Sequence, residues 1–405
     1  HLQPYPNLSY KDIPAELAWE MNLPLVRGYK FIWLDILGCG GNAIKHLWGV
    51  CGVRTNERFR ISDKDIYLQS YRNILCHDKV AIWLKARNFG GEWENVKLYY
   101  LITHKVPAFC VVRDPISILK AFVNHLNGDL GVITRKVNLT FAYEDIILDI
   151  IYLYGKPTPS FKWLENYTGF DNTLNQRIRK LSTKDSIVDI NYIPFESISP
   201  SNAYQTFCSL VLQLGFDEPK NRKPFESKIN GHDRHYLFPF SLFLHPQDIE
   251  NLYQDSKENH QRNEDSLKSE ESIEVIVALD HHTQFCNQEF KNITAWILED
   301  RDYQLNYRVS IYLKAKDFPL DLELLQAAKT YLLGYMETLE KKELEEKKKL
   351  FKEKDILEYF KANKEVREKY QVFFNEDYQH IREVRPDLVE SWKYYQEFLK
   401  ICKEG

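Results

Sequence analysis

Several features that identify membrane-spanning, secreted or nucleic-acid-binding proteins are missing from this 405-residue sequence. No apolar run approaches the roughly 20 residues that a helix needs to cross a bilayer. The start, His1-Leu2-Gln3-Pro4, shows no signal-peptide pattern, and we expect the natural N-terminus to lie upstream. The formal net charge of −4 argues against general binding to nucleic acid.

Cysteine is also scarce and lacks any recognisable arrangement. The seven cysteines show neither a Cys-x-x-Cys pair nor the Cys/His spacing of a metal site. Reduced thiols in the cytoplasm are the simplest explanation. We therefore expect a cytoplasmic protein with no metal site and no permanently bound cofactor. A composition that is 44% hydrophobic and 28% charged is typical of a globular chain, long enough here for two or three domains.

The segment from Tyr99 to Leu126 predicts a strand, a turn and a helix. Residues 108–112 are apolar and rich in valine, which favours a buried strand, and apolar side chains at helical spacing follow Pro115. Asp114 suits the N-cap and Pro115 the first helical position. Arg113 then lies at a turn where open α/β sheets bind ligands, beside a helix N-terminus that favours anions. The alternative is an Arg113–Asp114 ion pair that only stabilises the turn.

An earlier segment predicts a second strand, turn and helix. Residues 29–37 are apolar, Gly38-Cys39-Gly40-Gly41-Asn42 follows, and Ile44, Leu47 and Trp48 then lie on one helix face. Backbone N–H groups of such a glycine turn can surround a phosphate. The turn lacks the Lys-Ser/Thr ending of a Walker A motif and does not match the dinucleotide fingerprint. Alternatively, the glycines only permit tight packing.

The rest of the chain predicts further elements and four regions. Helices are expected over 67–76, 145–153 and 203–214, with Gly215 ending the last one, and from residue 320 onward; strands are expected over 187–192, 273–279 and 307–313. Glu337/Lys341, Glu343/Lys347 and Glu345/Lys349 are expected to pair on a solvated helix face. The predicted regions are a lead-in (1–28), a donor-binding core (29–235), the remainder of the core or an acceptor-side insertion (236–320) and a C-terminal helical region (321–405).

The order of these motifs resembles the sulfotransferase fold, an α/β sheet related to P-loop kinases whose donor is a 3′-phosphonucleotide. The resemblance implies that residues 38–42 bind the 5′-phosphate and that Arg113 binds the 3′-phosphate. It also implies that His104, in Ile102-Thr103-His104, is the catalytic base, and Pro194-Phe195-Glu196-Ser197-Ile198 loosely matches a further motif. The resemblance covers residues 29–216. Gly38 replaces the phosphate-loop lysine, Ile102 the lysine near the base, and Ala121 a serine, so Lys120 or Lys45 would have to supply the missing cation.

The whole chain, including residues 13–21 and 109–115, more closely resembles bacterial capsule-locus proteins that include O-methyl phosphoramidate transferases of surface polysaccharides. This resemblance implies a 3′-phosphocytidine 5′-diphosphoramidate donor and a sugar hydroxyl as acceptor. The partners expected from it are a nucleotide donor and a polysaccharide or sugar acceptor.

Other interpretations stay open at this stage. His281-His282 is a second candidate base, and Arg234 and His235 are candidates to close over the donor. A sulfotransferase using 3′-phosphoadenosine 5′-phosphosulfate is the main alternative. A nucleotide-sugar glycosyltransferase ranks lower, because the candidate for its Asp-x-Asp metal motif, Asp63-Lys64-Asp65, falls in an early segment that no predicted element places. The chain could also be a non-catalytic scaffold.

Overall fold

The computed structural model describes most of the chain, and the described residues divide into two units. The described residues are 9–57, 62–85, 97–126, 133–166, 178, 187–226, 234–253, 267, 269, 271–280, 282–299, 301–317 and 321–404. Unit 1 comprises residues 1–123, 161–226 and 351–405, and unit 2 comprises residues 124–160 and 227–350. Each unit has its own five-stranded sheet.

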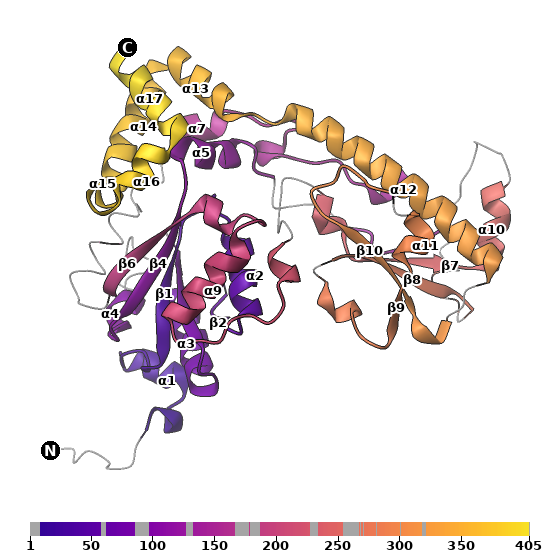
Figure 1. Ribbon diagram of the computed structural model, residues 1–405, viewed down its shortest axis with the longest axis horizontal. Coiled ribbons are helices and arrows are strands. Elements are labelled where there is room, and N and C mark those ends of the chain that lie inside the picture. The colour runs from indigo at the N-terminus through magenta and orange to yellow at the C-terminus, as the bar shows by residue number, and fades with distance from the viewer. Residues whose placement is uncertain are drawn as a thin grey trace. The chain divides into compact units, whose positions relative to one another are not determined.

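The sheet of unit 1 has the strand order β2-β3-β1-β4-β6, and every neighbouring pair is parallel (Figure 1). Its strands are β1 (Tyr29–Asp35), β2 (Arg54–Thr55), β3 (Val80–Lys85), β4 (Val106–Val112) and β6 (Ile187–Pro194). The helices before, between and after them are α1 (Ala15–Glu20), α2 (Gly41–Val50), α3 (Asp63–Cys76), α4 (Lys97–Leu101), α5 (Pro115–Val123), α7 (Lys162–Asn166) and α9 (Ala203–Gln213). The chain therefore alternates strands and helices, as a parallel sheet requires.

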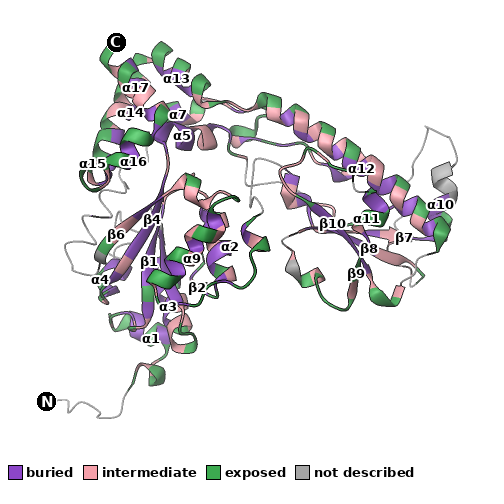
Figure 2. Cartoon of the chain, viewed as in Figure 1, coloured by how far each residue is buried: buried purple, intermediate pink, exposed green. Residues whose placement is uncertain are grey.

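Other elements of unit 1 cover both faces of this sheet, so the central strands β1 and β4 carry apolar side chains on both sides. Figure 2 shows β1 and β4 buried along most of their length. On one face Trp33 stacks on its register partner Trp83, with ring centroids 5.5 Å apart, and also contacts Trp48 of α2. On the other face Ile32 joins the core formed with α3 and α5. Runs of this kind are typical of strands buried on both sides.

The end of the chain adds a group of helices to unit 1. They are α13 (Glu353–Ala362), α14 (Lys364–Asp377), α15 (Gln379–Val384), α16 (Pro386–Ser391) and α17 (Lys393–Glu404). Their aromatic side chains, including Phe360, Phe374 and Tyr395, are buried in the same core as α5. Pro386 begins α16, where a missing N–H does no harm. The C-terminal helices therefore stabilise the helix that follows Arg113.

Unit 2 contains a mixed sheet with the order β5-β7-β8-β10-β9, antiparallel except for β5 and β7. Its elements are β5 (Lys136–Asn138), α6 (Tyr143–Ile146), β7 (Phe240–Leu244), α10 (Pro246–Tyr253), β8 (Ile273–Leu279), β9 (Phe290–Asn292), α11 (Thr294–Leu298), β10 (Val309–Lys314) and α12 (Leu322–Lys349). The 28-residue helix α12 buries a row of apolar side chains against this sheet, including Leu332, Tyr335 and Leu339. Among all described helices, none combines the length and apolar character needed to cross a membrane.

The α/β class, the open sheet flanked by helices and the C-terminal helical region are confirmed. The two units follow a different division from the predicted regions. The range 29–235 loses residues 124–160 and 227–235 to unit 2. The helical region 321–405 is shared, with α12 in unit 2 and the later helices in unit 1. These exchanges depend on contacts between distant segments, which a linear pattern does not encode.

Two local predictions were wrong. The helix predicted over 145–153 is limited to Tyr143–Ile146, after which Tyr152 forms a β-bridge with Lys156 instead. Glu343 does not pair with Lys347 on a solvated face; it is 1% exposed and accepts hydrogen bonds from Arg234. In both cases a buried partner far away in the sequence overrode the local preference: Glu346 for Tyr152, and Arg234 for Glu343.

Candidate functional site

The sheet of unit 1 has a topological switch point between β1 and β4. The chain leaves β1 for β2 and β3 on one side, and then crosses to β4 and β6 on the other side. Because all the strands are parallel, the turns after β1 and β4 meet at the same edge (Figure 1). Open α/β sheets bind their ligands in the crevice outside such carboxyl ends. The glycine turn follows β1 and Arg113 follows β4, so the structure brings these two predicted features together.

The glycine turn requires glycine at two positions. Gly38 and Gly40 have φ values of +82° and +74°, which other residues rarely adopt. A Cβ at Gly40 would also lie 3.1 Å from Ile198. Gly40 is the N-cap of α2 and has no side chain to accept hydrogen bonds from the first turn of the helix. The N–H groups in the first turn of a helix have no intrahelical acceptors, and they therefore favour an anionic ligand. Cys39 is buried, whereas Asn42 is exposed.

Arg113 is fixed by two contacts that leave most of its hydrogen-bonding capacity unused. Its Nη1 donates a 3.0 Å hydrogen bond to the carbonyl oxygen of Gly38. Its guanidinium carbon lies 4.1 Å from the ring centroid of Phe195, which follows β6. A guanidinium has five N–H donors, and among the described residues Gly38 is the only acceptor that Arg113 has. The half-buried guanidinium therefore keeps its charge and several donors beside the N-terminus of α2.

Asp114 does not form the predicted alternative ion pair with Arg113. Its Oδ1 accepts from the N–H of Ile116 at 2.9 Å, which caps α5. Its Oδ2 accepts from the N–H groups of Tyr394 and Tyr395 at 2.8 and 3.3 Å, which caps α17. Burial raises the pKa of Asp114 in spite of these bonds. One carboxylate therefore joins the turn after β4 to the last helix of the chain.

The assignment of His104 as the base of this site is contradicted by its position. His104 precedes β4 and lies at the amino ends of the strands, where Tyr29 donates to its carbonyl at 3.0 Å and accepts from its N–H at 2.8 Å. The strand β4 lies between His104 and Arg113, and at a rise of about 3.3 Å per residue its length of roughly 20 Å separates them. Burial, followed by the charges of Arg27 and Lys30, lowers the pKa of His104. A sequence match does not reveal which end of a strand a residue occupies.

Lys120 is also unsuited to the predicted role of donor-binding cation. Its Nζ lies 2.6 Å from Oε1 of Glu353 in α13, and the same oxygen accepts a hydrogen bond from Ser117. Lys45, the other substitute, donates to the carbonyl oxygen of Asn56 at 3.1 Å. Arg113 is thus the cation that the structure places at the glycine turn without a carboxylate partner among the described residues.

The remaining sequence candidates have structural partners. Arg234, in unit 2, is 2% exposed and lies near two glutamates of α12. His281 is outside the described residues, and Nδ1 of His282 accepts from the N–H of Leu279 at 3.3 Å. In the near match to a metal motif, Asp65 forms a capping box with Ser62 at the start of α3. Within the described parts of the chain, no three His, Cys, Asp or Glu side chains are grouped to bind a metal ion.

Residues 192–404 match a family model described as a protein of unknown function, DUF2972. Because the match covers more than half of the 405 residues, the chain belongs to this family. It includes Phe195 and the C-terminal helices, whereas the glycine turn and Arg113 lie before it. No curated protein and no solved structure matches the chain.

Two parts of the site were missed by reasoning from sequence. The ring of Phe195 on Arg113 falls inside a motif that was noted, but nothing in that motif pointed to the arginine. The backbone of Tyr394 and Tyr395 bonds to Asp114 from 280 and 281 residues away, and a backbone donor has no sequence signal at all.

Proposed function

We propose that unit 1 binds a nucleotide with phosphates on both its 3′ and 5′ positions at the carboxyl edge of the parallel sheet. The observation that carries this proposal is Arg113 at the switch point, bonded to the Gly38 carbonyl and stacked on Phe195, with its other donors directed to no protein group described. An anion on the first turn of α2 and a second anion on Arg113 would satisfy both sets of N–H groups. A ligand with two separated phosphates supplies both anions.

The reaction that we propose is transfer of a phosphoramidate group to a sugar hydroxyl. The P–O bond between the phosphoramidate and the 5′-phosphate breaks, and a new P–O bond forms to the sugar oxygen. The 3′,5′-bisphosphate leaves, and the hydroxyl proton passes to solvent or to the departing phosphate. Such transfers depend mainly on positioning and charge neutralisation. Backbone N–H groups and one arginine can supply these, so the proposal assigns no role to His104.

Two lines of support bear on the identity of the donor. The parallel sheet, the glycine turn after β1 and the arginine after β4 occur in the order found in sulfotransferase-like proteins. The resemblance of the sequence to capsule-locus phosphoramidate transferases favours cytidine over adenosine. Sulfation from 3′-phosphoadenosine 5′-phosphosulfate is the alternative, and the choice of base distinguishes the two.

The test is a calorimetric titration of the full chain with 3′,5′-bisphosphates of cytidine and adenosine and with their 5′-monophosphates. We expect the cytidine bisphosphate to bind most tightly. Arg113→Ala should weaken it by about 2–4 kcal/mol and abolish the preference over the monophosphate, because a charge-assisted contact is lost. Arg72→Ala is the matched control, since Arg72 is an exposed arginine paired with Glu16 on α1.

Each other outcome has a defined meaning. Tighter binding of the adenosine bisphosphate would replace phosphoramidate transfer by sulfation. Equal affinity of the wild type and Arg113→Ala for both forms of the nucleotide would remove Arg113 from the site. No binding of any of the four nucleotides would favour a scaffold or a glycosyltransferase.

A further inference from the structure

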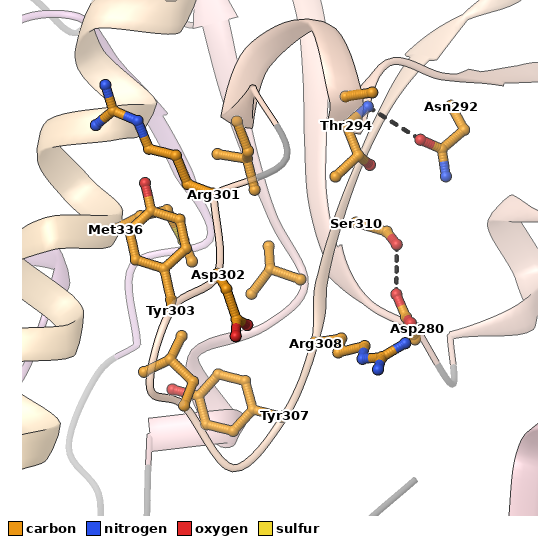
Figure 3. Close-up of a pocket in the computed structure, with 14 residues that line it drawn as sticks. Asp280, Asn292, Thr294, Arg301, Asp302, Tyr303, Tyr307, Arg308, Ser310 and Met336 are labelled. Atoms are coloured by element: carbon orange, nitrogen blue, oxygen red, sulfur yellow. Dashed lines mark hydrogen bonds between the residues drawn. The ribbon is translucent and has the colours of Figure 1, made fainter. Parts of the chain in front are cut away.

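Unit 2 contains a pocket of about 420 Å³ that the proposed donor site does not use. The side chains that line it, most of them labelled in Figure 3, come from the ends of β8, β9 and β10, from α11 and α12, and from the segment between α11 and β10. All of these elements belong to unit 2. The volume is in the range of small-molecule sites, which is about 300–1,000 Å³.

The lining balances its charges and includes many groups that can form hydrogen bonds. Two carboxylates and two guanidinium groups line the pocket, together with two tyrosines, a serine, a threonine and an asparagine: Asp280, Asp302, Arg301, Arg308, Tyr303, Tyr307, Ser310, Thr294 and Asn292. A nucleotide or a phosphate would bring two or more negative charges beside two aspartates. A strongly cationic ligand would be repelled by the two arginines. The lining therefore favours a ligand that is polar and uncharged.

Part of this lining is held in place by the protein itself. The Ser310 hydroxyl donates to Oδ1 of Asp280, and Oδ1 of Asn292 accepts from the N–H of Thr294 at 3.0 Å (Figure 3). Arg301 is paired with Glu337 of α12 at 2.9 Å. These bonds orient side chains at the edges of the pocket before any ligand arrives, which lowers the entropy cost of binding.

The remaining charged groups are available. Asp302 and Arg308 are exposed, and no described residue forms a hydrogen bond or an ion pair with either side chain. A carboxylate only accepts hydrogen bonds and a guanidinium only donates them, whereas a hydroxyl does both. Sugar hydroxyls can therefore bond to either of these groups. The tyrosine side chains add apolar ring surface for the C–H face of a sugar ring.

We propose that this pocket binds a neutral carbohydrate. The binding site stands on the geometry of unit 2 alone and does not depend on the proposed function. Asp302, Arg308 and Asn292 would bond to hydroxyls of the sugar.

The test is saturation-transfer NMR and calorimetry of the full chain with glucose, galactose, N-acetylglucosamine and lactose, in the absence of nucleotide. We expect saturable binding of at least one of these sugars in the millimolar range. Asp302→Ala and Arg308→Ala should each weaken it by about tenfold, the effect of one lost hydrogen-bonding group. Glu289→Ala and Lys316→Ala are the matched controls in the same unit; both residues are exposed and outside the pocket, and neither substitution should change the affinity.

Two results would overturn the proposal: no saturable binding of any of the four sugars, or binding that is unchanged in both Asp302→Ala and Arg308→Ala. The nucleotide titrations are repeated on these variants and should match the wild type. Sugar binding without nucleotide binding would reject the donor site alone, and nucleotide binding without sugar binding would reject this pocket alone.

Discussion

Two arginines, one in each unit, are used in opposite ways. Arg234 of unit 2 is 2% exposed, and its Nε donates to the carbonyl of Leu148 at 2.8 Å. Its guanidinium nitrogens lie 3.5 Å from Glu343 and 3.7 Å from Glu346. Arg113 of unit 1 is half-buried and has a single carbonyl acceptor among the described residues. One arginine is enclosed by carboxylates, and the other is oriented but retains its charge.

The comparison shows that the acceptors around an arginine indicate its role better than its sequence context does. Both residues have an aspartate or a histidine beside them in the sequence, and both are sequence candidates for contact with the nucleotide donor. A buried guanidinium without carboxylates would be very costly, so Arg234 and its two glutamates are needed together. Arg113 has no such requirement, since a carbonyl and an aromatic ring fix its direction without neutralising it.

The largest effect that we predict concerns stability and belongs to Arg234. Arg234→Met should lower the free energy of unfolding of unit 2 by about 3–5 kcal/mol, because the buried cation that faces Glu343 and Glu346 is lost and only Glu346 keeps a further cation, Lys349, 3.0 Å away. Arg113→Ala should cost less than about 1 kcal/mol, since its side chain is half-exposed. Urea denaturation followed by circular dichroism measures both. Equal losses of unfolding free energy in Arg234→Met and Arg113→Ala would show that the two arginines do not differ in their structural role.

The next prediction concerns Asp114, the neighbour that does not pair with Arg113. Asp114→Ala removes an acceptor from the first turns of α5 and α17 together. We expect a loss of about 2 kcal/mol, or about 1 kcal/mol for each helix cap. Asp65→Ala, which removes one of the two capping side chains of a single helix, α3, should cost about half as much in the same denaturation experiment. A loss no larger than that of Asp65→Ala would show that the bond to α17 contributes nothing.

A smaller loss than those of Arg234 and Asp114 is predicted for the ion pair of Lys120 with Glu353. Lys120 is less buried than Arg234 but, unlike Arg113, has a carboxylate partner among the described residues. Burial alone would raise the pKa of its partner Glu353, but hydrogen bonds, led by that from Lys120, outweigh burial and lower that pKa below 4.5. A lowered carboxyl pKa stabilises the fold above the ordinary pKa, and this stabilisation is lost as the pH falls through the folded value. Glu353→Gln should therefore lose about 1 kcal/mol at pH 7.

The difference between the wild type and Glu353→Gln should shrink as the pH falls below about 4.5, because Glu353 then becomes neutral in the wild type too. Urea denaturation at a series of pH values between neutral and acid measures this convergence. Glu358→Gln, on the same helix α13, is the control, since Glu358 forms an exposed pair with Lys361. A constant difference at all pH values would show that the ionised pair is not its cause.

Much of the secondary structure could be predicted because its causes are local. The strand starting at Tyr29, the helix starting at Pro115 and the helix ending before Gly215 all follow from apolar periodicity, a suitable first residue or a glycine with a positive φ. The helix predicted over 145–153 failed, since its residues have tertiary partners: Tyr152 donates to Glu346 at 2.7 Å. Local preference gives way where a buried side chain needs a distant acceptor.

For the candidate site, the sequence by itself determined the pieces: a glycine turn after one strand and an arginine after another, each followed by a helix. Only the tertiary structure decided that these turns meet at one edge, that His104 lies at the opposite edge and that Lys120 is already paired. The physical reason is that spacing along a chain fixes which way a residue faces within its own helix or strand. The order of strands in a sheet, and therefore which charges end up together, is set by packing between segments far apart in sequence.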